Sequence, residues 1–182
     1  MKLPKFLLLT CAIVLAPSVA IASDLPPIKP VAHVDLPRFM GPWYLIASIP
    51  TVFEKHAWNA VETYTLQPDG NVHTTFRFNN GAADGPVKQI HSTGYVHPGT
   101  GNAVWGVKVF GPFKAQYVVA WLKPDYSEMI VARDARDYTW VFARTPTVPA
   151  ADWDKLLARV KARGDDRGKR RKVPQQGPGA VP

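Results

Sequence analysis

The side chains best suited to catalysis or metal binding are few and widely scattered along the 182-residue chain. Its five histidines show none of the close spacings, such as H-E-x-x-H, that hold a zinc ion. No serine stands in the Gly-x-Ser-x-Gly turn that presents a hydrolase nucleophile. The one cysteine, Cys11, lies inside an N-terminal apolar run. We therefore predict no catalytic residues, no metal site and no cofactor.

Glu62 is the carboxylate whose position is most informative. It shares strand parity with Tyr64, so both side chains are predicted to face the same side of a sheet. A carboxylate on a buried face is costly unless it is paired or hydrated. It could meet a cationic or hydroxyl head group of a ligand. Alternatively, it lies at a solvated edge, or a bulge has shifted the register.

Short runs of alternating polarity supply the elements that would position such a side chain. Turn signals such as Pro68-Asp69-Gly70-Asn71 and His97-Pro98-Gly99 separate these runs. Eight strands are predicted, over residues 43–49, 60–67, 71–78, 87–96, 103–110, 115–122, 128–133 and 138–143. The pattern indicates an all-β, eight-stranded, up-and-down antiparallel barrel, which is wide enough to enclose one small ligand.

One helix is predicted after the strands, over residues 149–163. Pro149 suits its first position, Thr147 is a candidate cap, and Gly164 suits its end. Trp153, Leu156, Leu157 and Val160 form a single apolar stripe. A helix with one apolar stripe must pack against another surface, so we expect it on the outside of the barrel.

Two short motifs stand at the ends of the strand region. Gly41-Pro42-Trp43 opens the first strand, and Arg144 follows the last. With residues 107–113, 136–140 and 173–176, these motifs resemble the lipocalin family, in particular the bacterial outer-membrane and apolipoprotein D-like members, over residues 34–176. The resemblance implies that Arg144 packs across the ring of Trp43 and closes one end of the barrel. A guanidinium over an indole contributes about 0.5 to 2 kcal/mol.

The resemblance also implies a calyx, a barrel whose interior holds a lipid. Strand parity with the aromatic residues nominates the side chains that line it. The predicted lining is Leu45, Ala47, Glu62, Tyr64, Leu66, Phe76, Phe78, Trp105, Val107, Tyr117, Val119, Trp121, Trp140 and Phe142.

The function implied is binding, storage or transport of fatty acids or lysophospholipids in the bacterial envelope, in support of membrane maintenance. We expect a monomer or weak homodimer. Two other interpretations stay open. One is a lipid-modifying enzyme on the same barrel. The other is a non-catalytic envelope interaction module that uses loop 50–58, whose Val52, Phe53 and Trp58 are unusually apolar for a solvated loop.

The chain ends carry export and surface signals. Residues 1–22 are predicted to be a signal peptide, with Lys2 and Lys5, an apolar run and the small-x-small site Ala20-Ile21-Ala22. Residues 23–34 are an expected extended linker, 35–176 the lipocalin domain and 177–182 a flexible tail. Cys11 lies in a poor lipoprotein signal, since Thr10 precedes it and the apolar run continues beyond it. We therefore favour export to the periplasm or outer membrane with cleavage after Ala22 over a lipid anchor at Cys11.

The net charge of +8 falls to +6 once the two signal-peptide lysines are removed. Part of the excess lies in the run 167–172, which is either a solvated tail or a contact for an anionic membrane surface. An exported chain without a nucleic-acid-binding motif is not expected to bind nucleic acid.

Overall fold

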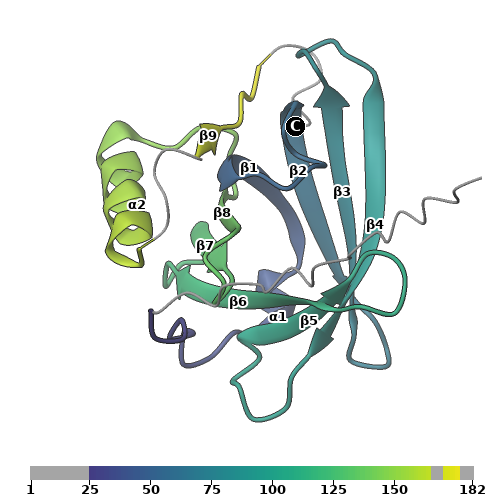
Figure 1. The fold of residues 1–182 in the computed structure, drawn as a ribbon, viewed down its shortest axis with the longest axis vertical. Helices are drawn as coiled ribbons and strands as arrows, with labels where there is room; N and C mark the ends of the chain where they lie inside the picture. The colour runs from purple at the N-terminus through teal and green to yellow at the C-terminus, as the bar shows by residue number, and fades with distance from the viewer. Residues whose placement is uncertain (1–24, 165–169, 177–182) are drawn as a thin grey trace, which may run out of the picture.

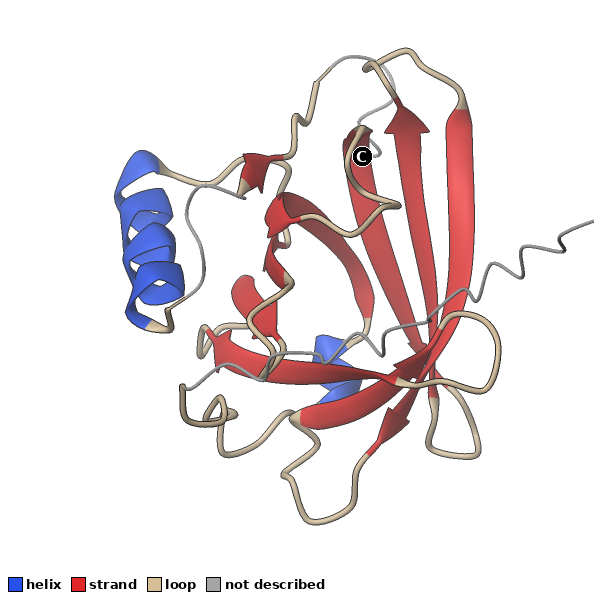
Figure 2. Cartoon of the chain, viewed as in Figure 1, coloured by secondary structure: helices blue, strands red, loops and turns tan. Residues whose placement is uncertain are grey.

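The computed structural model describes residues 25–164 and 170–176. Its eight main strands form a closed antiparallel barrel, in which each strand pairs with the next and β1 pairs with both β2 and β8 (Figures 1 and 2). The strands are β1 (Gly41–Ile49), β2 (Ala57–Leu66), β3 (Val72–Asn80), β4 (Val87–Val96), β5 (Val104–Lys108), β6 (Ala115–Leu122), β7 (Glu128–Ala132) and β8 (Thr139–Ala143). The predicted eight-stranded up-and-down barrel is confirmed.

The turn between β2 and β3 shows how local sequence sets the register. Gly70 has a φ of +80°, which a residue with a Cβ rarely adopts. The Asn71 backbone N–H donates to the Asp69 carboxylate over 3.0 Å. This local bond favours the chain reversal and aligns Leu66 with Val72 across the pair.

The predicted outer helix is α2 (Ala150–Ala162), which stands beside the barrel on the side away from β3 and β4 (Figure 1). Leu156 and Val160 are buried in a cluster with Ala47, Ile130 and Val141. The helix begins directly after Pro149, and no side chain caps it, so the prediction that Thr147 caps it is wrong. No helix among the described residues is both long enough and apolar enough to cross a membrane.

Bulges in β1 and β6 create the surface on which α2 packs. The register of β1 against β8 shifts between Leu45 and Ala47, and that of β6 against β7 shifts between Val119 and Trp121. Each extra residue moves the following side chains to the opposite face of the sheet. Ala47 and Trp121 therefore face outward and join the cluster under α2.

Two short elements were not predicted: the helix α1 (Leu36–Phe39) and the strand β9 (Arg171–Lys172). β9 pairs with β1 where β1 has separated from β2. Beyond β9, the Gln175 side-chain amide donates to the carbonyls of Leu45 on β1 and Ala60 on β2, over 3.0 and 3.1 Å. The segment 171–176 thus bridges the gap between the two strands.

The described end of the basic run is therefore part of the sheet. Arg171 and Lys172 form β9, and Lys172 remains exposed there, so contact of the basic run with an anionic surface stays a prediction. Residues 167–169 of that run lie outside the described residues, as do the predicted signal peptide, Cys11 and the tail 177–182.

The described part of the expected linker, residues 25–34, forms neither helix nor strand and lies against the barrel. Ile28 and Val34 are buried. The Val31 N–H donates to the Val119 carbonyl over 2.9 Å, and the Val34 N–H donates to the Gly101 carbonyl over 2.7 Å. These contacts fix the approach of the chain to α1.

Arg144 closes one end of the barrel, as the motif implies. Its guanidinium carbon lies 3.9 Å from the centre of the Trp43 ring. Its Nη1 donates to the carbonyl of Pro42 over 2.8 Å, and its Nη2 donates to those of Arg38 and Phe39 over 2.9 and 3.0 Å. The indole Nε1 of Trp43 also donates to Phe39, over 2.8 Å. One cation therefore ties β8, β1 and α1 together.

Replacing Arg144 with Met should lower the free energy of unfolding by about 3 kcal/mol, because charge-assisted hydrogen bonds and the cation–π contact are lost together. Arg144→Lys is the matched control. It keeps the charge but lacks the planar fork, so it should recover only part of the loss. Urea unfolding followed by tryptophan fluorescence measures both. A Met variant that unfolds at the wild-type midpoint would contradict this account of the closed end.

Candidate functional site

A cavity of about 290 Å³ occupies the barrel above the Trp43 floor. Its wall is mostly apolar and aromatic, and loop residues surround its opening. The lining residues are Thr51, Val52, Phe53, Glu54, Glu62, Tyr64, Thr74, Phe76, Ile90, Ser92, Val107, Val109, Ala115, Gln116, Tyr117, Arg133, Tyr138, Trp140 and Phe142. An apolar concavity with a few polar groups is typical of small-molecule sites, and its volume is near the lower end of their range.

Packed aromatic rings form the base of the cavity. The hydroxyls of Tyr64 and Tyr117 lie 2.8 Å apart and hydrogen-bond each other. Trp105 stacks on Tyr117 with ring centres 4.9 Å apart, and Phe39 contacts Tyr64 edge-on at 5.3 Å. Burial raises the pKa of both tyrosines well above the usual value, so their hydroxyls stay neutral. The base is therefore uncharged, and each tyrosine hydroxyl already has a partner.

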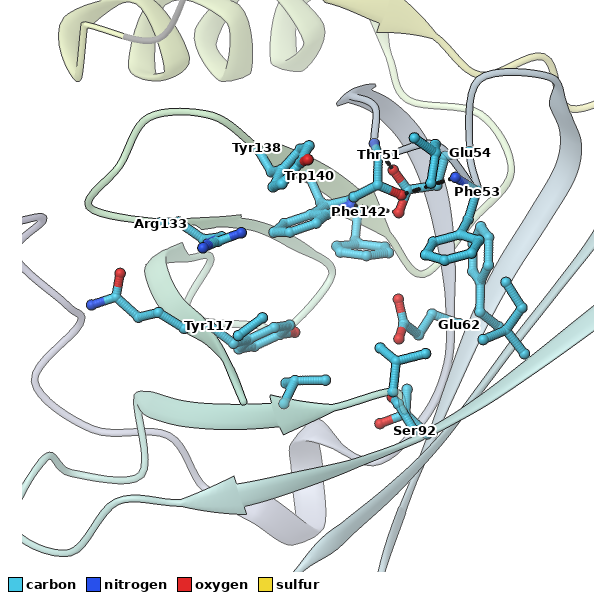
Figure 3. A pocket seen from close by; sticks show the side chains of 18 of the residues that line it. Thr51, Phe53, Glu54, Glu62, Ser92, Tyr117, Arg133, Tyr138, Trp140 and Phe142 are labelled. Atoms are coloured by element: carbon cyan, nitrogen blue, oxygen red, sulfur yellow. Dashed lines mark hydrogen bonds between the residues drawn. The ribbon is translucent and has the colours of Figure 1, made fainter. Parts of the chain in front are cut away.

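Glu62 projects from β2 into this cavity, toward the space between Tyr117 and Phe142 (Figure 3). It lies opposite Trp43 on β1 and Phe76 on β3. Burial raises the pKa of the Glu62 carboxyl to about 8, and the nearby Glu54 carboxylate adds to the rise. The carboxyl is therefore mostly protonated at neutral pH.

Glu54 is a second carboxyl at the cavity, carried by loop 50–56. It accepts hydrogen bonds from the Thr51 N–H over 2.7 Å and from the Trp140 indole N–H over 3.0 Å. Burial raises the pKa of Glu54, and these hydrogen bonds partly oppose the rise. The same loop reaches across the opening, because Phe53 contacts the ring of Phe110 at 5.5 Å.

Arg133 supplies the one cationic side chain among the cavity-lining residues. Its Nη1 lies 3.3 Å from the Asp137 carboxylate, and its guanidinium lies 5.3 Å from the centre of the Tyr138 ring. Figure 3 shows it on the opposite side of the cavity from Glu62. The two carboxyls and this paired guanidinium are thus kept apart.

The predicted lining set divides into three groups. Half of it lines the cavity: Glu62, Tyr64, Phe76, Val107, Tyr117, Trp140 and Phe142. Four members are buried in the same interior cluster without lining the cavity: Leu45, Phe78, Trp105 and Val119. Ligand contact by any of them stays a prediction.

The remaining three were placed wrongly. Ala47 and Trp121 lie outside the barrel under α2, because a bulge precedes each of them and reverses its parity. Leu66 is 37% exposed at the last position of β2, beside the turn and far along the strand from Glu54 and the opening.

Other lining residues were missed. Thr74, Ile90 and Ser92 on β3 and β4 share the parity of the predicted lining but are not aromatic, so parity with aromatic residues does not indicate them. A parity rule applied to every strand residue finds them. Arg133 and Tyr138 flank the connection between β7 and β8, where strand periodicity gives no signal.

Histidines do not contribute to the cavity wall. His73 and His91 stack on each other at 5.4 Å, on strand positions whose neighbours Thr74 and Ser92 face inward. Within residues 25–164 and 170–176, no group of three potential metal ligands comes together.

Comparison with known proteins decides the family. The model of the lipocalin-like domain matches residues 34–175. This chain is a lipocalin.

Among the relatives of this lipocalin is the outer membrane lipoprotein Blc of Vibrio cholerae, which is 31% identical over 152 residues, covering 82% of this chain and 87% of the relative. Bovine apolipoprotein D is 28% identical over 123 residues, covering 68% and 57% of the two chains. Insecticyanin from the tobacco hornworm superposes with a TM-score of 0.64 at 17% identity, covering 86% of this chain and 88% of that one. The structural likeness supports the fold, and the predicted family is confirmed.

The position of Glu62 predicts a pH effect on the stability of this lipocalin. Its pKa is about 8 in the folded protein against 4.5 normally, so between these values the folded state binds more protons than the unfolded state. The free energy of unfolding should therefore fall as pH rises through this window, by up to about 1.4 kcal/mol per pH unit.

Glu62→Gln removes the contribution of Glu62 to the pH dependence of the free energy of unfolding. Glu54, whose pKa is also raised, still contributes with the same sign. Urea unfolding at about pH 5 and pH 8 measures the effect. From pH 5 to pH 8, the free energy of unfolding of the variant should rise by roughly 3 kcal/mol relative to that of the wild type. Parallel pH profiles for the two proteins would contradict burial of this carboxyl.

Proposed function

We propose that this lipocalin binds and carries single-chain lipids, such as fatty acids or lysophospholipids, in the bacterial cell envelope. The observation that carries the proposal is the cavity of about 290 Å³ with its aromatic wall. Burial of an acyl chain there would gain about 0.8 kcal/mol per methylene group. The limited volume favours one acyl chain over two.

The envelope location rests on the relatives and on the predicted signal peptide. The Vibrio cholerae relative is named an outer membrane lipoprotein. For this chain we favour an exported protein cleaved after Ala22 and acting as a monomer or weak homodimer. Sequencing the N-terminus of the mature protein tests cleavage, since a start at Ser23 and an acylated Cys11 are distinguishable by mass.

A lipid-modifying enzyme is the less favoured alternative. Catalysis of acyl transfer or hydrolysis usually needs a nucleophile activated by a base. The cavity wall provides hydroxyls from Thr51, Thr74 and Ser92 but no histidine, and neither cavity carboxyl is hydrogen-bonded to Thr74 or Ser92. The geometry therefore supports binding better than turnover.

Blocking the cavity tests the carrier function. Val107→Trp places a large ring inside the barrel and should reduce lysophospholipid uptake at least about tenfold, because the ring takes the volume of the acyl chain. Lys108→Trp is the matched control, since Lys108 is the next residue of β5 and is exposed. Native mass spectrometry after incubation with a single-chain lysophospholipid measures bound lipid.

The control should keep wild-type uptake, and both variants should keep the circular dichroism spectrum of a folded barrel. If Val107→Trp takes up as much lipid as Lys108→Trp, the ligand does not use this cavity. Lipid extraction from protein purified from its own envelope adds the identity of any natural ligand.

The rim of the cavity supports docking at an anionic membrane as part of this function. Three apolar side chains at the opening are strongly exposed: Val52 (70%), Phe110 (64%) and Phe113 (83%). Exposed lysines lie in the same loops and adjoining strand ends, at positions 55, 88, 108 and 114. Apolar tips surrounded by cations suit insertion between anionic headgroups, which would bring the opening to the source of its lipid.

Replacing Phe110 and Phe113 together with Ser should weaken binding to vesicles containing phosphatidylglycerol by about tenfold or more, given the apolar area withdrawn from water. Leu66→Ser removes an exposed apolar side chain away from the rim and should bind vesicles like the wild type. Flotation with vesicles measures both. An equal loss in the two variants, or loss of a homodimer in the rim variant alone, would contradict membrane docking.

A further inference from the structure

We propose that the Glu62 carboxyl recognises a protonated amine, so that the cavity prefers amine-bearing amphiphiles over carboxylic acids of the same chain length. This inference rests on the lipid-binding function proposed above and names the head-group chemistry that the cavity selects.

The carboxyl of Glu62 has no protein partner among the described residues, in either hydrogen bonds or ion pairs. Its neighbours across the sheet are Trp43 and Phe76, and it projects into a space bounded by Tyr117 and Phe142 (Figure 3). The Glu62 side chain is half-buried, and a carboxyl that faces an apolar space without a donor is costly to keep. A ligand that supplies the donor recovers part of that cost. An ammonium group supplies three donors and the opposite charge.

Glu54 strengthens the preference for a cation without competing for it. Its two oxygens already accept hydrogen bonds from Thr51 and Trp140, so it is held in place. Its charge still acts on the cavity, since it contributes to the raised pKa of Glu62. The Glu54 carboxylate, joined by Glu62 once that carboxyl ionises, attracts a cation and repels a ligand carboxylate.

The other groups that face this space do not neutralise the acids. The hydroxyls of Tyr64 and Tyr117 bond to each other. Arg133 lies on the opposite side of the cavity from Glu62, where its Nη1 is paired with Asp137 and its Nε has no partner in the described part of the chain. Thr74, Ser92 and Tyr138 are uncharged, Lys88 is exposed near the rim, and Arg144 lies against the Trp43 ring at the floor. A cation for Glu62 must therefore come from the ligand.

Binding of an ammonium group is then coupled to release of a proton. At pH 6 the Glu62 carboxyl is protonated, and forming its ion pair with the ligand requires its proton to leave to solvent. Affinity should rise with pH and level off above about 8, where the carboxyl is already ionised in the free protein. Between pH 6 and pH 8 the expected gain is about 50-fold, provided that the amine itself stays protonated.

Isothermal titration with three probes of one chain length tests this: dodecylammonium, 1-dodecanol and dodecanoate, each below its critical micelle concentration. At pH 8 the wild type should bind dodecylammonium at least about tenfold more tightly than dodecanol, and dodecanoate most weakly. Glu62→Gln should bind dodecanol as before and lose both the preference for the amine and its pH dependence.

Asp84→Asn is the matched control, because it removes an exposed carboxylate from the loop between β3 and β4 and should change neither property. Dodecanoate binding as tight as that of the amine, or a Glu62→Gln variant that keeps the amine preference, overturns the inference and leaves lipid binding intact. Failure of all three probes, dodecanol included, overturns the carrier function and the inference with it.

Discussion

The contact of Arg144 with Trp43 is the interaction on which the barrel depends. A barrel that holds a ligand cavity must be closed at one end, and here a single guanidinium covers the floor while donating to carbonyls of α1 and β1. Gly41 is part of the same closed end of the barrel. Its φ of +90° suits glycine, and a Cβ there would lie 3.5 Å from the Arg144 Nη1. The aromatic base of the cavity rests on this floor, since Phe39 contacts Trp43.

Above the floor, apolar walls determine what the two carboxyls can do. In water an exposed carboxyl is ionised at neutral pH and interacts weakly, but in a low-dielectric space each charge acts over a longer distance. This is why Glu62 keeps its proton, and why Glu54 needs two hydrogen-bond donors to hold its position. The cavity therefore selects ligands by charge as well as by shape. The rim side chains determine the surface from which the ligand enters.

The strands, the outer helix and the floor motif were predictable because each leaves a local pattern: alternation, an apolar stripe, and paired Gly41-x-Trp43 and Arg144 signals. The lining was predictable only in part. Strand parity correctly predicts that Glu62 and Tyr64 face the cavity. It gives the wrong face for residues after Leu45 and Val119, because a bulge is a property of the pairing between strands rather than of either sequence alone. β9 and α1 are too short for any periodicity, and tertiary contacts define them.

The bridging segment has a consequence for how the molecule forms. β1 begins at Gly41, yet it is completed by β8 and by residues 171–176, so its hydrogen bonds join parts of the chain separated by about 90 to 130 residues. Contacts of this range raise the contact order and slow folding, since much of the loop entropy is lost before they form. Until the last described residues arrive, β1 and β2 present unpaired edges that can pair with another chain. The barrel wall can therefore be completed only when almost the whole chain is available.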